Sequence, residues 1–190
     1  MNTGDEILFN HYEWRVLDIQ NDMALIITKY VISQHAYHHK HVEVTWADCE
    51  LRKFLNGTFY KSFNKAERAR IVPVTNTNPD NQWYGANGGK DTHDRIFLLS
   101  IEETACKYFG DSSERLYNRG KNQRYWFQKP DTNNTQRMTT FNRGGWSWWL
   151  RSPGRLNKTA AYIHGSGEIG IQGNNVSTLG GVRPALWLRV

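Results

Sequence analysis

The stretch Asn142–Gly154, "NRGGWSWWLRSPG", places three tryptophans within four positions and frames them with arginines, glycines and a proline. In a β-strand, alternate side chains share a face, so Trp146 and Trp148 would lie on one face and Ser147 and Trp149 on the other. A strand with indoles on both faces belongs in the middle of a sheet. We therefore interpret the tryptophans as core residues that close the fold. A stacking platform for sugars or bases is the alternative.

The composition indicates one globular domain over residues 1–190. Only 38% of the residues are hydrophobic, but aromatic residues make up 13% and supply much of the apolar area for a core. We find no tandem repeat and no interior linker. Arg151 and Arg183 flank the C-terminal strands and are expected to hold carbonyl or carboxylate groups of the scaffold, since a guanidinium fork suits fixed geometry.

The net charge of +6 favours acidic partners, but the basic residues are scattered and no Lys/Arg run exceeds two. We therefore expect no nucleic-acid partner, and keep a basic nucleic-acid-binding domain as an alternative. The sequence shows no signal peptide and no transmembrane run. This pattern is typical of a cytoplasmic chain, or of a module taken from a larger surface or phage protein.

The N-terminal half predicts strands and capped helices. Strands are expected over 14–19 and 24–28 with a turn at 20–22, and a polar loop over 34–44. Capping residues predict a helix over 45–57, begun by Thr45 with Asp48 and ended by Gly57, and a helix over 64–70, begun by Asn64 with Glu67.

Further along, Ser100 and Glu103 predict a helix that stops at Gly110. Strands are expected over 71–75, where Pro73 indicates an edge, and over 94–100. Residues 76–93 and 111–145 predict long loops, which are often functional. The last 45 residues read as short strands linked by glycine turns.

Four segments occur in an order that resembles a bacterial domain family of unknown function, common in gut Firmicutes and their phages. They are "TWADCELRKFLNGTFYKSFNKAERARI" (45–71), "GGKDTHDRIFLLSIEETACKYFG" (88–110), "WSWWLRSPG" (146–154) and "GVRPALWLRV" (181–190). The similarity covers roughly residues 7–190. "RGGWSW" and "GVRPAL" also resemble the paired central strands of the formylglycine-generating-enzyme type of C-type-lectin-like fold. The resemblance implies an α+β fold: a small twisted antiparallel sheet flanked by two main helices, with long loops.

Some members of that family are variable proteins of diversity-generating retroelements, in which template adenines are mutated. Their variable region resembles residues 155–180 here, which we call the window. An inward frame of small and apolar residues is expected to alternate with outward positions (frame: Ala160, Ala161, Ile163, Gly167, Ile169, Gly173, Val176). Asn codons with mutated adenines reach every residue type except Lys, Glu, Gln, Met and Trp. Lys158, Glu168 and Gln172 therefore do not fit that origin.

The outward positions are the predicted ligand-binding residues. Tyr162, His164, Leu156 and Arg155 are the expected anchors, because aromatic residues and arginine dominate binding energies. The ligand is expected to be a protein or glycan surface, and an exposed aromatic strand would also permit a homo-oligomer. The full set is Arg155, Leu156, Asn157, Thr159, Tyr162, His164, Ile171, Asn174, Asn175, Ser177, Thr178 and Leu179.

Two kinds of motif in the sequence resemble metal sites. His35, His38, His39 and His41 cluster in "HAYHHKH", but without a second ligand group of convincing spacing they indicate a solvated loop. "NTNPDN" (76–81) and "QKPD" (128–131) resemble short calcium motifs of sugar-binding C-type lectins, but the partner W-N-D motif is missing and Asx/Pro turns explain them. We expect no metal and no cofactor.

The cysteines carry the alternative of catalysis. A formylglycine-type oxidase needs paired reactive cysteines, whereas Cys49 and Cys106 lie far apart in expected helices and indicate buried free thiols, a disulfide staying open. The sequence has no Ser-His-Asp signature, P-loop or Rossmann glycine motif. We therefore expect a binding module and not an enzyme, with a formylglycine-generating-type enzyme as the alternative.

Overall fold

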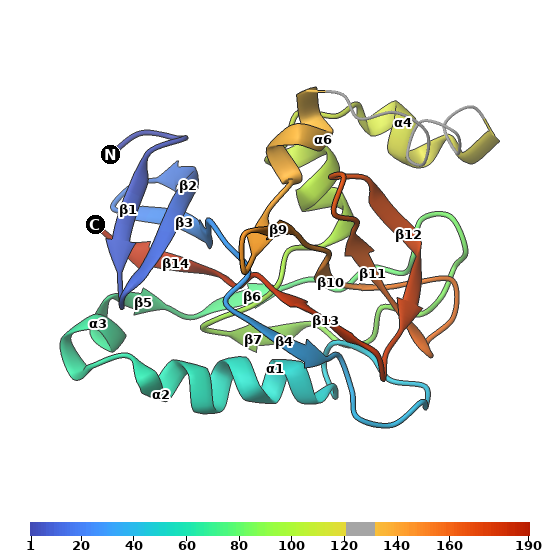
Figure 1. The fold of residues 1–190 in the computed structure, drawn as a ribbon, viewed down its shortest axis with the longest axis horizontal. Coiled ribbons are helices and arrows are strands. Elements are labelled where there is room, and N and C mark those ends of the chain that lie inside the picture. Colours follow the sequence, from blue (N-terminus) through green and yellow to red (C-terminus); the bar gives the residue numbers. More distant parts are fainter. Residues whose placement is uncertain (121–131) are drawn as a thin grey trace.

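Two five-stranded sheets carry the fold in the computed structural model, which describes residues 1–120 and 132–190 (Figure 1). The N-terminal sheet has the order β1 (Glu6–Phe9), β2 (Tyr12–Gln20), β3 (Met23–Thr28), β14 (Ala185–Arg189), β5 (Ile71–Val72). The C-terminal sheet has the order β12 (Ile169–Asn175), β11 (Thr159–Ile163), β10 (Trp148–Pro153), β13 (Leu179–Val182), β4 (Ser33–Ala36). Two small ribbons pair β6 (Val74–Asn76) with β7 (Thr92–Asp94), and β8 (Thr140–Phe141) with β9 (Gly144–Gly145).

The predicted α+β class is confirmed, because helices accompany these sheets. One helical run at the lower edge of Figure 1 consists of α1 (Glu50–Phe54), a π-helical segment η1 (Leu55–Phe59) and α2 (Tyr60–Ser62). The others are α3 (Lys65–Arg70), η2 (Glu103–Lys107), α4 (Ser113–Tyr117) and α6 (Thr132–Arg137). None of the described helices has the length and apolar character that crossing a bilayer requires.

The tryptophan stretch forms the centre of the C-terminal sheet, as its pattern predicted. All six residues of β10 are buried, and β10 pairs antiparallel with β11 and parallel with β13, where Trp148 lies opposite Gly181. Trp148 and Trp149 are essentially inaccessible, and their indole N–H groups donate to the carbonyls of Arg137 and His35. Trp146 precedes the strand and is exposed, so its assignment to the core was wrong.

Two arginines join distant segments, as expected. Arg151 donates to the carbonyls of Leu98 and Thr77 and forms a two-pronged ion pair with Glu103. Arg183 donates to the Thr28 carbonyl (2.7 Å), and its guanidinium lies 5.0 Å from the Trp148 ring centroid. Burial lowers the pKa of Arg183 to about 9, which still leaves the side chain charged at neutral pH.

Two helix predictions are confirmed in their caps and one needs correction. Asn64 and Glu67 form a reciprocal capping box on α3, and Ser100 and Glu103 form one ahead of η2. The predicted helix over 45–57 instead begins at Glu50, with Cys49 as its cap, and runs past Gly57 to Ser62.

One strand prediction and one loop prediction also need correction. Residues 94–100 are mostly buried, but beyond the end of β7 at Asp94 they form only one bridge, from Phe97 to Ala185. The Asn56 side chain meets the backbone groups of Arg95 and Ile96, so side chains replace the partner strand. The predicted loop over 34–44 begins instead within β4, which pairs with β13.

Candidate ligand-binding surface

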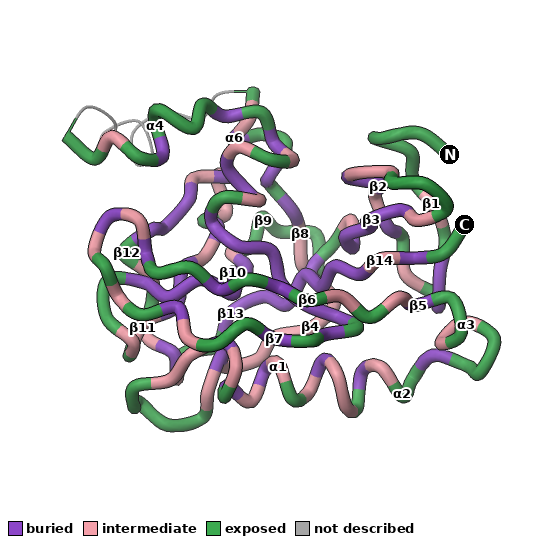
Figure 2. Tube along the Cα trace, turned by 180° about the vertical axis from the view of Figure 1, so that it is seen from behind, coloured by how far each residue is buried: buried purple, intermediate pink, exposed green. Residues whose placement is uncertain are grey.

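The window forms one edge of the C-terminal sheet. It contains β11, the edge strand β12 and the turns around them, and it ends at the start of β13 (Figure 1). Its frame is buried as expected except at Gly173, which is half-buried and lies at a β-irregularity with φ of 79°. The outward positions therefore stand on a packed support (Figure 2).

Most of the predicted binding residues reach the surface. One is a correction: Ile171 is fully buried, because it lies two residues after buried Ile169 on β12 and therefore points to the same inward face of the strand. The exposed members are Arg155, Leu156, His164, Asn174, Thr178 and Leu179, and the half-buried ones are Asn157, Thr159, Tyr162, Asn175 and Ser177.

The structure divides these residues between two ends of the sheet. Thr159 pairs with Asn175, so the turns at 155–158 and 176–178 lie together at one end. Ile163 pairs with Ile169, which places His164 at the other end. A single ligand contacting all of them would have to span the length of β11.

An open hollow of about 400 Å³ lies along this edge. The residues that line it include predicted ligand contacts and one tryptophan that the sequence analysis assigned to the core. Predicted contacts Tyr162, His164 and Asn174 line it together with Trp146 and Ser147. Trp146 was missed because its place in the tryptophan stretch suggested core. The signal that could have found it is the preceding diglycine, which ends the ribbon of β8 and β9 just before Trp146.

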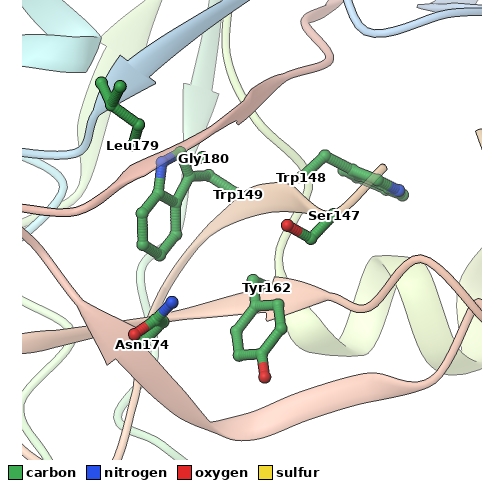
Figure 3. A pocket seen from close by; sticks show the side chains of 7 residues that line it. All are labelled: Ser147, Trp148, Trp149, Tyr162, Asn174, Leu179 and Gly180. Carbon is green, nitrogen blue, oxygen red and sulfur yellow. The ribbon is translucent and has the colours of Figure 1, made fainter. Parts of the chain in front are cut away.

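Two aromatic rings lie flat over glycines on one face of the sheet. An added Cβ at Gly170 would come within 2.4 Å of the Tyr162 ring, and one at Gly180 within 2.4 Å of the Trp149 Nε1. Figure 3 shows Trp149 and Tyr162 on the same side with Asn174 beside them, whereas Trp148 points away. Burial, together with the Glu168 carboxylate, raises the pKa of Tyr162, so its hydroxyl is a neutral hydrogen-bonding group at physiological pH.

The hairpin between β11 and β12 is ordered by its own polar side chains. Ser166 Oγ lies 2.7 Å from His164 Nδ1 and 3.2 Å from Glu168 Oε2. The three residues alternate within one turn, which is the local pattern of serine turns. The arrangement fixes the direction of His164 at the rim of the hollow.

The long loop over 76–93 supports the opposite end of the window. Buried Asn81 donates to the carbonyls of Pro153 and Ile171, and so connects β10 to β12. The loop also extends the surface, since Asn157 donates to the Asn87 carbonyl and the Arg155 guanidinium lies 5.8 Å from the Tyr84 ring centroid. Sequence reasoning marked this loop by its length but did not connect Tyr84 and Asn87 with the window.

The other motifs fall into structural roles or outside the described residues. In "NTNPDN", the amide N–H groups of Asn76, Asn78 and Asn81 donate to groups that lie 12 or more residues away, and Asn81 Oδ1 forms a local Asx turn by accepting from the Trp83 backbone N–H. The motif "QKPD" (128–131) lies outside the described residues. Both cysteines are free thiols, and burial raises the pKa of Cys49 to about 12. Among the described residues, His38, His39 and Glu50 form a group whose donor atoms could share a metal ion.

Comparison with known proteins places the chain in one family. The sequence model of DUF6273, a domain of unknown function, matches residues 21–190, so the chain belongs to this family. No curated protein and no solved structure matches it.

Proposed function

We propose that this member of the DUF6273 family is a ligand-binding module that recognises a protein or glycan surface through its window. The observation that carries the proposal is the contrast within the window between a buried frame and exposed residues of unrelated types. Leu156 and Leu179 are 61% and 69% exposed, so both apolar side chains are available to a partner. Recognition by such a surface needs shape and a few anchoring side chains, and no chemistry.

We propose further that the scaffold is C-type-lectin-like and that the window is diversified by a retroelement. In support, the two segments that carry the resemblance meet in the C-terminal sheet, where Trp148 lies opposite Gly181, although β10 and β13 run parallel and not antiparallel as the resemblance implied. All but one of the predicted diversified positions are at least partly accessible, so they tolerate replacement without disturbing the core. Buried Ile171 belongs instead to the invariant frame.

The two alternative functions find less support. A formylglycine-type oxidation needs an available thiolate, whereas Cys49 is buried and its raised pKa keeps it protonated at neutral pH. For nucleic-acid binding, the window contributes only Arg155 and Lys158 as basic residues. Titration with a single-stranded oligonucleotide of about 30 nucleotides, at low and then at higher salt, tests the nucleic-acid alternative, because nucleic-acid binding weakens steeply as salt rises.

The genetic test is to sequence the 3′ end of this gene from many cells of one source population. Substitutions confined to codons 155–180, at adenine positions of a nearby template repeat, are expected. Frame codons such as those of Ala161 and Ile171 should stay constant. An invariant window would leave a module of fixed specificity and sink the retroelement proposal.

The binding test uses arrays of glycans and of purified surface proteins from the same population. Leu179→Ala is expected to weaken any specific signal by about fivefold or more, the loss typical of a contact residue. Leu8→Ala is the matched control, because Leu8 is a leucine with 75% exposure in β1 of the other sheet. The window is not the contact surface if Leu179→Ala and alanine at Arg155, Leu156 and His164 change binding no more than Leu8→Ala does.

A further inference from the structure

Two adjacent histidines and a glutamate meet beside the C-terminal sheet. His38 and His39 follow β4, and Glu50 is the first residue of α1. His39 Nδ1 lies 2.5 Å from Glu50 Oε1, and His38 Nδ1 lies 3.9 Å from Glu50 Oε2. One donor atom from each of the three residues lies within 4.8 Å of the other two.

Hydrogen bonding accounts for His39 and Glu50 but not for His38. The Glu50 carboxylate accepts from the His39 backbone N–H at 2.8 Å, in addition to its contact with the His39 ring. The Nδ1 atom of His38 is buried and has no hydrogen-bond partner, although its ring directs it toward the same carboxylate. A buried ring nitrogen without a hydrogen-bond partner destabilises the folded chain, so a group that binds it would stabilise the loop.

The spacing fits a transition-metal ion better than a third hydrogen bond. Bonds of about 2.0–2.1 Å place two ligand atoms of a tetrahedral zinc ion roughly 3.3 Å apart. The separations here bracket that value, and rotation of the exposed His39 and Glu50 side chains can equalise them. Two imidazoles and a carboxylate are a ligand set that suits zinc and neighbouring divalent ions.

We propose that His38, His39 and Glu50 bind one divalent transition-metal ion, with zinc as the representative ion and a water at the fourth position. His39 and Glu50 are more than 40% exposed in their side chains, which leaves a route for the ion to enter. His35 is not part of the site, because its ring stacks on Phe54 with centroids 4.2 Å apart. The site could bind a metal ion whether or not the window binds a ligand.

Metal binding would restrict the loop that contacts the window. The His38 backbone N–H donates to the Val176 carbonyl, and the Val44 backbone N–H donates to the Asn157 carbonyl. The loop that carries both histidines therefore touches the two window turns that lie together at one end of the sheet. A metal ion joining this loop to α1 would limit the movement of both turns.

The test titrates zinc chloride alone into the chain, purified without a histidine tag, by isothermal calorimetry, and follows unfolding by heat. We expect one ion per chain with a Kd of about 1 µM or below, and a higher Tm that returns to the starting value with a chelator. His38→Ala, His39→Ala and Glu50→Gln should each weaken binding by about 10- to 100-fold. His41→Ala, an exposed histidine of the same loop, is the control and should bind as the unaltered chain does.

The variants also separate a built site from surface binding. His38→Ala removes the unsatisfied nitrogen, so without metal its Tm should be no lower than that of the unaltered chain. A weaker affinity of this variant for zinc can then be assigned to the missing ligand and not to unfolding. The proposal is overturned if the unaltered chain takes up less than one ion at about 100 µM zinc. It is equally overturned if loss of His41 matters as much as loss of His38, or if His38→Ala leaves affinity unchanged.

Discussion

Gly180 makes room for a tryptophan that the sheet needs. The Trp149 ring covers it so closely that an added Cβ would lie 2.4 Å from the indole nitrogen. We expect Gly180→Ala to lower the free energy of unfolding by about 1–3 kcal/mol, because the ring must leave its rotamer or the strand must move. Urea denaturation measures the change.

The matched control is Gly57→Ala. Gly57 lies in the helical run, and nothing lies within 4 Å of an added Cβ there. Alanine should raise stability by about 0.5–1 kcal/mol or leave it unchanged. If the two alanines behaved alike, the close packing of Trp149 on β13 would be refuted.

Glu103 gives stability a defined dependence on pH. Burial opposes its ionisation, but the charge and hydrogen bonds of Arg151 outweigh it, so the pKa of Glu103 lies below its ordinary value. Such a carboxylate contributes stability above its unfolded pKa, and this contribution is lost as pH falls through the folded pKa. Glu103→Gln should therefore cost up to about 3 kcal/mol at pH 7 and progressively less in acid.

Urea denaturation of both chains between neutral and acidic pH measures this difference. Glu43→Gln is the control, because Glu43 is exposed and lies far in sequence from the ion pair of Arg151 with Glu103. A constant difference between the Glu103 variant and the unaltered chain at every pH would contradict the assigned ionisation.

Ile171 and Trp146 show where residue-level prediction failed. Ile169 and Ile171 are two residues apart on β12, so strand alternation turns both side chains inward, and the placing of Ile171 among the outward positions overlooked this spacing. Trp146 sits in a core-like composition, yet the strand begins two residues later. The spacing alone could have corrected the first error, whereas the second depends on where the strand begins, which single-sequence patterns do not specify.

At the scale of elements, Asn81 connects the long loop to the C-terminal sheet. Its amide donates to carbonyls of β10 and β12, and its Oδ1 accepts from the backbone N–H groups of Trp83 and Tyr84. Asn81→Ala should cost about 2 kcal/mol, because buried carbonyls and N–H groups lose their partners. Amide hydrogen exchange should rise in residues 82–87 more than in β3.

The substitution Asn81→Asp keeps the acceptor and removes the donors. It should free the two strand carbonyls while leaving the loop turn in place, so exchange at Trp83 and Tyr84 should stay slow. Asn174→Ala, on the exposed surface of β12, serves as control. Fast exchange at the loop in the aspartate variant would show that strand contacts alone order it.

Elements with local signals were predictable, and elements built by distant partners were not. The capping boxes of Asn64 and Ser100 involve residues three apart, so the sequence contains all that forms them. The segment 94–100 looked like a strand because it is apolar, but its backbone groups bond to the Asn56 side chain, some 40 residues away, and to Arg151 and Ala185, still further along the chain. The surface around the window likewise depends on the 76–93 loop, whose contacts no short pattern encodes.

At the scale of the molecule, the two large sheets are mechanically joined. The chain passes from β13 to β14 within two residues, and so from one sheet to the other. Buried Arg183 bonds to the Thr28 carbonyl at the end of β3 and packs on Trp148 of β10. One cluster of buried apolar residues includes residues of both sheets. Buried residues are drawn in purple in Figure 2.

This connection predicts that the sheets unfold together. The slowest-exchanging amides of β3 and of β10 should report the same free energy of opening, and both should follow the global value from urea denaturation. Arg183→Met removes the polar link and should lower both values equally, because a shared core transmits the loss. A lower free energy of opening for β10 alone would mean that the C-terminal sheet, which carries the window, unfolds separately from the rest of the molecule. The exposed residues of the window would then lack the rigid support that recognition by a fixed surface requires.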